Sequence, residues 1–421
     1  MSMGRPPPSA GSSQARFGQH TPAAAYASGG RWTPEAPASI LQAAERCTSA
    51  GDLAVRHGLS IMHLQAVGGS RHTTPGSTIF RRAALRAGAL SLAAAACVPA
   101  LCAQTSPPSP LCTTQGVMSA DMRQGIANTA LGIATAIQSN DTARVQSMSA
   151  PALAANFDAT SYIVRSTAAK IAGNSLRVTQ LFRLDASSRT AGDTGEATFS
   201  CPLSGSSSEV DFGIAGLPPG IYAFAMVEAS GARPWLLAFL LEQQGTAWKV
   251  AGFYQHARTA AGHDGLWYWT TARADAKAGQ KWRAWVLYGE ADQLLRAANF
   301  MSSSHLDQLR TERRSNAPPE LSEGLNANTP LVIKSKQGAE FPITDLSSSG
   351  TEDGKGLDLV VHFRADPLAD PVAARGRNVA AAKALLLAHP ELREGFTGVS
   401  VFADTAGQPP FATQHPWTEL Q

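Results

Sequence analysis

A long run of alternating hydrophobic and polar residues between residues 176 and 254 is the clearest pattern in the chain. Leu176 and Val178, for example, alternate with polar neighbours, and this two-residue period is typical of a β-strand with one buried face. The last two apolar segments are separated by Gln244-Gly245, which indicates a hairpin turn. We therefore expect antiparallel strands at residues 176–184, 197–203, 210–214, 221–229, 234–243 and 247–254.

Helical spacing precedes these strands. Apolar residues recur every three or four positions from Met122 to Ile137 and predict a helix over residues 119–139. A further helix over residues 161–172 is expected to end at Gly173, because glycine readily adopts the left-handed conformation that stops a helix. Helices followed by an antiparallel run of strands indicate the α+β class, with N-terminal helices on a curved antiparallel sheet.

This element order resembles the nuclear-transport-factor-like superfamily, which has a cystatin-like cone. The resemblance covers roughly residues 117–256 and includes the closing segment 245–254, Gly-Thr-Ala-Trp-Lys-Val-Ala-Gly-Phe-Tyr. The strand expected near residues 209–214 is an addition to that pattern. The resemblance implies a pocket on the concave face of the sheet within a domain at residues 117–262, and some members of the superfamily use a pocket carboxylate as a general base.

Two smaller units are expected after the sheet. Trp282, Trp285 and Leu294 recur at helical spacing within a predicted helical hairpin over residues 263–316. Six of the eight tryptophans lie between residues 235 and 285, and we interpret them as core between sheet and hairpin. The alternatives are a ligand site or an interface. A small C-terminal α/β unit follows at residues 325–421, with strands at 330–334, 341–345, 357–364 and 398–403 and a helix at 372–387.

The segment before the predicted domains indicates export. Three arginines precede a 16-residue apolar run, Ala87 to Cys102, in the order of a secretory signal peptide, which we place at residues 80–103. Residues 1–79 are then a disordered or mis-called extension, and residues 104–116 a linker. The expected location is periplasmic or secreted. A lipoprotein anchor at Cys97 and twin-arginine export are alternatives.

Charge and cysteine content are consistent with this division. Nine of the 35 basic and three of the 32 acidic residues precede residue 104, which leaves 26 basic against 29 acidic residues. Without a basic excess, nucleic-acid binding is disfavoured. Of five cysteines, only Cys112 and Cys201 follow the predicted signal peptide. We expect them to form a disulfide in an oxidising compartment, and two free buried thiols are the alternative.

Motifs with a known chemistry are missing from the sequence. It contains no HExxH, paired CxxC, Walker-type loop or GxSxG motif, so it implies no cofactor. The one local grouping of histidine with aspartate, His256, His263 and Asp264, has no third ligand nearby and is interpreted as a polar loop rather than a metal site. His362 and His389 are interpreted as structural.

The predicted strand at residues 221–229 supplies the candidate site. Glu228, the weak catalytic candidate, would be a general base if it were buried among aromatic side chains, since desolvation raises a carboxyl pKa. Its alternative is a strand-end residue in solvent. The other residues expected to line a narrow apolar pocket on this face are Tyr222, Phe224, Met226, Trp248 and Tyr254.

These observations favour an exported, non-enzymatic protein that binds a partner or a small apolar ligand. A small-molecule isomerase or hydrolase acting in the sheet pocket is the first alternative. A cell-surface assembly subunit is the second, and an exposed apolar patch on the C-terminal unit would support it.

Overall fold

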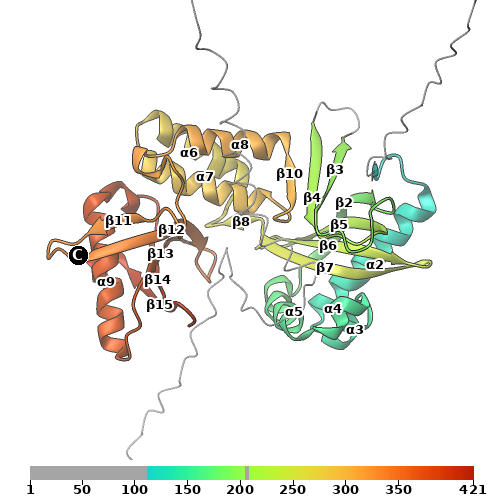
Figure 1. Cartoon of the computed structure of the whole chain (residues 1–421), viewed down its shortest axis with the longest axis horizontal. Coiled ribbons are helices and arrows are strands. Elements are labelled where there is room, and N and C mark those ends of the chain that lie inside the picture. The colour runs from blue at the N-terminus through green and yellow to red at the C-terminus, as the bar shows by residue number, and fades with distance from the viewer. Residues whose placement is uncertain (1–110, 204–207) are drawn as a thin grey trace, which may run out of the picture. The chain divides into compact units, whose positions relative to one another are not determined.

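The computed structural model describes residues 111–203 and 208–421 (Figure 1). Over these residues the fold is mixed α/β, with helices and several antiparallel sheets. The predicted signal peptide at residues 80–103, the preceding extension and Cys97 lie outside the described residues.

The first sheet has five antiparallel strands in the order β1-β2-β5-β6-β7. Strands close to the predicted positions 176–184, 221–229, 234–243 and 247–254 are confirmed. Strand β1 is a difference, because residues 104–116 were expected to be a linker, whereas four of them pair with β2. A segment this short carries no readable alternation. The strands are β1 (Leu111–Thr114), β2 (Ser175–Asp185), β5 (Ile221–Ser230), β6 (Trp235–Gln244) and β7 (Ala247–Ala257).

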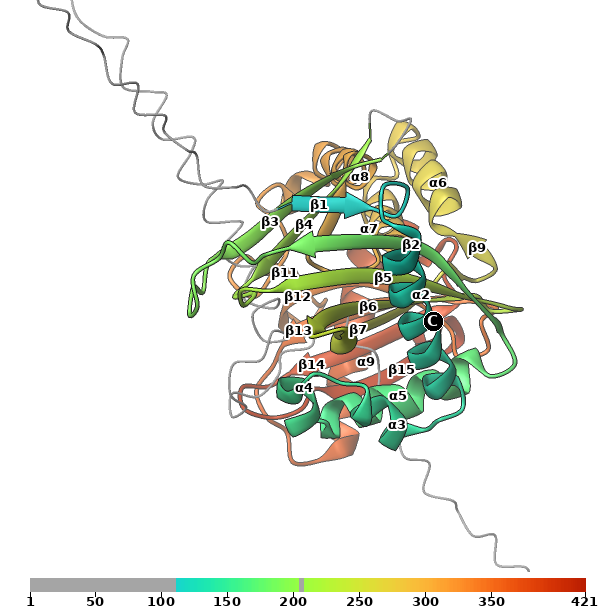
Figure 2. The same cartoon turned by 90° about the vertical axis from the view of Figure 1, so that its right-hand side faces the viewer.

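Helices pack on one face of this sheet, and α2 runs across its strands in Figure 2. The helix begins after Ser119, whose side chain accepts a hydrogen bond from the backbone N–H of Met122 and so caps it. Ile126, Ile133 and Ile137 are fully buried against small residues of β5, as the helical spacing predicted. The helices are α2 (Ala120–Gln138), α3 (Thr142–Ser147), α4 (Pro151–Ala155) and α5 (Asp158–Ile171).

A second, three-stranded sheet covers the opposite face, in the order β10-β4-β3. The sequence predicted β3 and β4 as part of one curved sheet, and this is wrong because β3 pairs with β4 and β4 pairs with β10. The physical reason is visible in β5 and β6, which are apolar on both faces and therefore need two covering layers. The strands are β3 (Glu196–Pro202), β4 (Glu209–Ala215) and β10 (Met301–Ser303).

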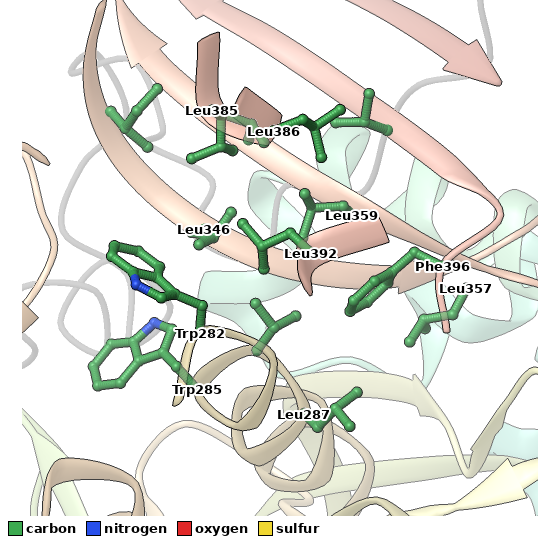
Figure 3. Close-up of a cluster of buried hydrophobic side chains, with 14 of the residues drawn as sticks. Trp282, Trp285, Leu287, Leu346, Leu357, Leu359, Leu385, Leu386, Leu392 and Phe396 are labelled. Carbon is green, nitrogen blue, oxygen red and sulfur yellow. The ribbon is translucent and has the colours of Figure 1, made fainter. Parts of the chain in front are cut away.

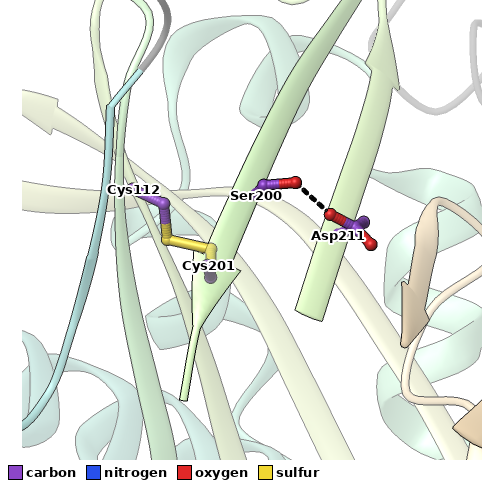
Figure 4. Close-up of a disulfide and its surroundings, with 4 residues drawn as sticks. All are labelled: Cys112, Ser200, Cys201 and Asp211. Carbon is purple, nitrogen blue, oxygen red and sulfur yellow. Dashed lines mark hydrogen bonds between the residues drawn. A yellow bond between two sulfur atoms is a disulfide. The ribbon is translucent and has the colours of Figure 1, made fainter. Parts of the chain in front are cut away.

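The predicted disulfide joins these two sheets. Cys112 of β1 is bonded to Cys201 of β3, with Cα atoms 5.3 Å apart (Figure 4). The prediction from the cysteine count is therefore confirmed. The bond fixes the edge strand of the first sheet to the edge strand of the second, so both layers are held around the core between them.

Three helices follow the sheets where a hairpin was expected. α6 and α7 form the hairpin, and α8 packs on α7. Helix α8 was missed because Leu306 and Leu309 are its only buried residues, too few to show a helical period. Trp269, Trp282 and Trp285 are buried, but in a core shared with the C-terminal sheet rather than with the first sheet as predicted, and Trp267 is 42% exposed. The elements are β8 (Thr259–Ala260), β9 (His263–Asp264), α6 (Gly265–Lys277), α7 (Lys281–Leu295) and α8 (Ser304–Ser315).

The C-terminal residues form a five-stranded sheet in the order β11-β12-β13-β14-β15. Strands β13 and β14 are parallel and are connected through α9, while their outer neighbours are antiparallel. Apolar residues of α7 and α9, such as Trp282 and Leu385, pack on one face of this sheet against strand residues such as Leu359 (Figure 3). The elements are β11 (Leu331–Lys334), β12 (Glu340–Gly350), β13 (Leu357–Arg364), α9 (Pro371–Ala388), β14 (Gly398–Asp404) and β15 (Phe411–Pro416), with 3-10 turns at Pro319–Leu321, Pro390–Arg393 and Trp417–Leu420.

Candidate functional site

The sheet face that was predicted to line a pocket is filled by aromatic side chains. Tyr222 and Phe224 are at most 1% exposed. The ring of Phe212 from β4 lies 5.2 Å from that of Phe224, and Phe300 lies 5.6 Å away on another side. Edge-to-face contacts of this kind are typical of a packed core. The expected pocket on this face is therefore closed by the second sheet, and Met226 is only partly buried at its margin.

Tyr254 belongs to the same core. Its ring packs edge-on against Phe300, with the ring centroids 5.1 Å apart. The ring also lies over Gly252, where a Cβ atom would be 2.9 Å from the tyrosine oxygen. The hydroxyl is buried, and no group in residues 111–203 or 208–421 hydrogen-bonds to it. Burial raises the pKa of this phenol. Tyr254 thus keeps its proton and serves as packing on this face.

Trp248 lies on the opposite face of β7 from Tyr254, which corrects the prediction that both line one pocket. In the pairing of β6 with β7, Leu241 is opposite Val250 and Leu240 is opposite Gly252, so Ala251 is an extra residue in the strand. Such a β-bulge reverses the alternation of side chains beyond it. Trp248 therefore packs with the helices.

Glu228 is a surface residue near the end of β5. Its Oε2 lies 3.1 Å from a guanidinium nitrogen of Arg177, and the Oγ of Ser230 donates a hydrogen bond to its Oε1 at 3.2 Å. The Glu228 side chain is 31% exposed, and that of Arg177 is 70% exposed. Glu228 is therefore a strand-end residue in contact with solvent, the alternative that the sequence left open. It is not the desolvated carboxylate that a general base at neutral pH requires.

A groove of about 580 Å³ lies between α2 and the turn that joins β6 to β7. Met122 and Met148 supply thioethers to it, and Trp248 supplies an indole ring. The indole Nε1 lies 4.0 Å from the Cβ position of Gly125 and has no hydrogen-bond partner within the described part of the chain. Asp121 and Lys249 add one charge of each sign, and the Lys249 ammonium donates to the Ser147 carbonyl at 2.9 Å.

Most of this groove is not evident from the sequence pattern, which pointed to Trp248 as a pocket residue but not to Met122, Met148 or Gly125. One signal was available, because Gly125 and Gly132 lie seven residues apart inside a helix, where glycine is unfavourable. Two turns apart, they leave room for the Trp248 indole and for the methyl group of Met148, which lies 3.6 Å from the Cβ position of Gly132. Small residues on one helix face indicate close approach of a partner group.

A buried carboxyl lies elsewhere, between α7 and β12. Glu290 is 3% exposed and accepts a hydrogen bond of 2.6 Å from the hydroxyl of Ser348, itself 2% exposed. Burial raises the pKa of Glu290 to about 7, which the Ser348 hydrogen bond only partly offsets. The pair lies within the apolar core formed by α7 and the C-terminal sheet.

The residues predicted to form a polar loop have structural roles, but His256 lies in strand β7 and His263 and Asp264 form β9, so the prediction of a loop is wrong for them. The ring of His263 stacks on Trp267 with centroids 3.7 Å apart, and Asp264 accepts from the Trp267 backbone N–H to cap α6. Burial, together with the charges of Arg258 and Arg296, lowers the pKa of His256 to about 4. No group of three or more metal-ligating side chains occurs among the residues whose positions are described.

In the described ranges, no helix is both long enough and apolar enough to cross a bilayer. Comparison with known proteins gives no relative: no protein-family model matches the chain, and no curated protein or solved structure shows significant similarity to it.

Proposed function

We propose that this chain is an exported protein that binds a small apolar ligand, with residues 117–262 forming a nuclear-transport-factor-like domain. Export is supported by the arginine-rich, apolar order of residues 80–103. The Cys112–Cys201 disulfide supports it independently, because disulfides persist in oxidising compartments. The domain assignment is supported by the order of the elements, in which α2 to α5 precede the long antiparallel strands.

The observation that carries the binding proposal is the groove beside Trp248. A volume of about 580 Å³ falls in the range of small-molecule sites, roughly 300–1,000 Å³. Its methionines adapt to ligands of different shape, since the thioether chain is unbranched and polarisable. The free indole N–H of Trp248 would hydrogen-bond a polar group on an otherwise apolar ligand. The opposite sheet face is already filled by aromatic rings, so the enzyme alternative at Glu228 has no comparable support.

Binding can be tested with 1-anilinonaphthalene-8-sulfonate as an apolar probe. Gly125→Leu should weaken probe binding by more than about 10-fold, because the added side chain projects into the groove. Gly125→Ala is the matched control and should bind like the wild type, since a Cβ alone meets nothing closer than 4.0 Å. The Trp248 indole N–H resonance should shift on titration. Equal binding by Gly125→Leu and the wild type would refute the groove as the site.

Export has a separate test. Protein recovered from the periplasm or the medium of the exporting cell should begin at or close to Gln104 when its N-terminus is sequenced. Exported protein that retained residues 1–60 would contradict the assignment of residues 80–103 as a signal peptide.

A further inference from the structure

The carboxyl edge of the parallel pair β13 and β14 carries a histidine and an aspartate in contact. His362 lies near the end of β13, and Asp404 is the last residue of β14. Because the strands are parallel and connected through α9, their carboxyl ends lie at the same edge of the sheet. Ligands of open α/β sheets bind outside this edge. The strand order thus brings these two side chains together at one edge of the sheet.

The geometry of the pair fixes the tautomer of the histidine. Both carboxylate oxygens of Asp404 lie 3.2 Å from Nδ1 of His362, so this nitrogen carries the proton and donates it. The ring of Phe402 stacks on the imidazole with centroids 4.5 Å apart and planes at 5°, which holds its orientation. Nε2 is left as the acceptor, and nothing in the described ranges hydrogen-bonds to it. The His362 side chain is 20% exposed.

Neighbouring charges leave this pair intact. Asp345 of β12 is directly opposite His362, but its Oδ2 accepts from the Ser347 hydroxyl at 2.7 Å. Arg364 is directly opposite Asp404, yet its guanidinium donates to the Ala327 carbonyl. The Asp404 carboxylate is therefore available to His362, and Arg364 remains an exposed cation two residues along the same face.

The same edge exposes apolar side chains. Leu368 lies in the connection from β13 to α9 and is 45% exposed, and Val372 in the first turn of α9 is 78% exposed. Because this segment leaves the carboxyl end of β13, these exposed side chains indicate an apolar part in a substrate that reaches this edge.

We propose that His362 and Asp404 form a general-base site that hydrolyses small esters of apolar acids. Nε2 of His362 takes a proton from water while the water oxygen bonds to the ester carbonyl carbon. The carbon–oxygen bond to the alcohol then breaks, and the imidazolium returns the proton to the leaving oxygen, which gives one acid and one alcohol. Asp404 stabilises the imidazolium, and Arg364 stabilises negative charge on the carbonyl oxygen. This site is separate from the groove of the proposed function.

The test uses p-nitrophenyl butyrate and the oxidised wild-type chain. General-base catalysis is typically worth about 10²–10⁴-fold, so His362→Ala should lose at least about 10-fold in kcat/KM. His263→Ala is the matched control, because this exposed histidine has no carboxylate partner in the described structure, and its rate should be unchanged. Asp404→Asn should also lose activity, since the neutral amide no longer stabilises the imidazolium.

Two further readouts separate catalysis from a structural role. Added imidazole should restore activity to His362→Ala, because the free base can take the place of the missing ring. Circular dichroism melting confirms that each variant is folded. A folded His362→Ala with the wild-type rate, or an equal loss in His263→Ala, would overturn the proposal.

Discussion

Trp248 and Tyr254 point to opposite faces of strand β7, although both are an even number of residues from Val250. The reversal occurs at Ala251, the extra residue in the pairing with β6. It sends the indole toward the helices and the phenol into the aromatic core. The bulge therefore places an open groove on one side of the sheet and closed packing on the other, and this division underlies the proposed binding site.

The fold-back of Tyr254 over Gly252 predicts a destabilising glycine substitution. A Cβ at residue 252 would lie 2.9 Å from the tyrosine oxygen and 3.1 Å from the ring, so Gly252→Ala forces the ring to move. Overpacking of this kind costs about 1–3 kcal/mol in the free energy of unfolding. Urea denaturation measures the change. Tyr254→Phe should instead be neutral or stabilising by about 1 kcal/mol, because it removes a buried hydroxyl without a partner in the described chain.

A marked destabilisation by Tyr254→Phe would contradict that account, since it would mean that the hydroxyl makes a hydrogen bond. The pair Gly252→Ala/Tyr254→Phe should also cost less than the sum of the single changes, because both act on the same crowded contact.

The face that carries Phe224 and Glu228 gives a contrasting pair of variants. Phe224→Ala removes a fully buried ring from the cluster with Phe212 and Phe300, and it should cost about 3–5 kcal/mol of unfolding free energy. Glu228→Gln breaks only an exposed ion pair with Arg177 and should change stability by less than about 1 kcal/mol. Probe binding at the groove should survive Glu228→Gln. A turnover activity abolished by Glu228→Gln in a folded protein would restore the enzyme alternative.

Much of the secondary structure could be predicted from the sequence, because long apolar periods specify helix α2 and strands β5 to β7 directly. The sequence does not show which face of the sheet each side chain occupies. A single unpaired residue reverses the alternation of side chains and leaves no separate mark in the residue pattern. Two bulges in the first sheet do this, one at Ala251 and one in β2, where Val178 and Gln180 pair with consecutive residues of β5. The alternation beginning at Leu176 predicts one buried face, whereas Leu176 packs with the helices and Phe182 faces the second sheet.

Short or polar elements were also beyond prediction. Strand β1 has four residues, and its place is set by pairing and by the disulfide rather than by a local pattern. The groove depends on which side of β7 Trp248 occupies, so it could not be located without the register. The Cys112–Cys201 pair was predictable because a count of two leaves only one intramolecular pairing.

Removing the disulfide should lower stability substantially. The bond closes a loop between positions 89 residues apart, for which the chain-entropy model gives about 4–5 kcal/mol, less any strain. Cys112→Ser/Cys201→Ser should therefore unfold at a lower urea concentration than the oxidised wild type. The reduced wild type should match the double variant. Identical midpoints for the oxidised and reduced wild type would show that the bond adds no stability.

The buried carboxyl of Glu290 predicts a specific dependence of stability on pH. Its pKa is raised from 4.5 to about 7 in the folded chain, so folding favours the protonated form. The favourable contribution of this carboxyl to the free energy of unfolding is fully present below pH 4.5, because the group is protonated in both states. It is lost between pH 4.5 and 7, because only the unfolded state ionises there. Glu290→Gln mimics the protonated side chain. It should match the wild type at pH 4 and exceed its unfolding free energy at pH 8 by up to about 3 kcal/mol. Urea denaturation at both pH values measures this, with the exposed Glu323→Gln as control. A Glu290→Gln variant less stable than the wild type at pH 8 would show that the ionised carboxylate is stabilised in the fold.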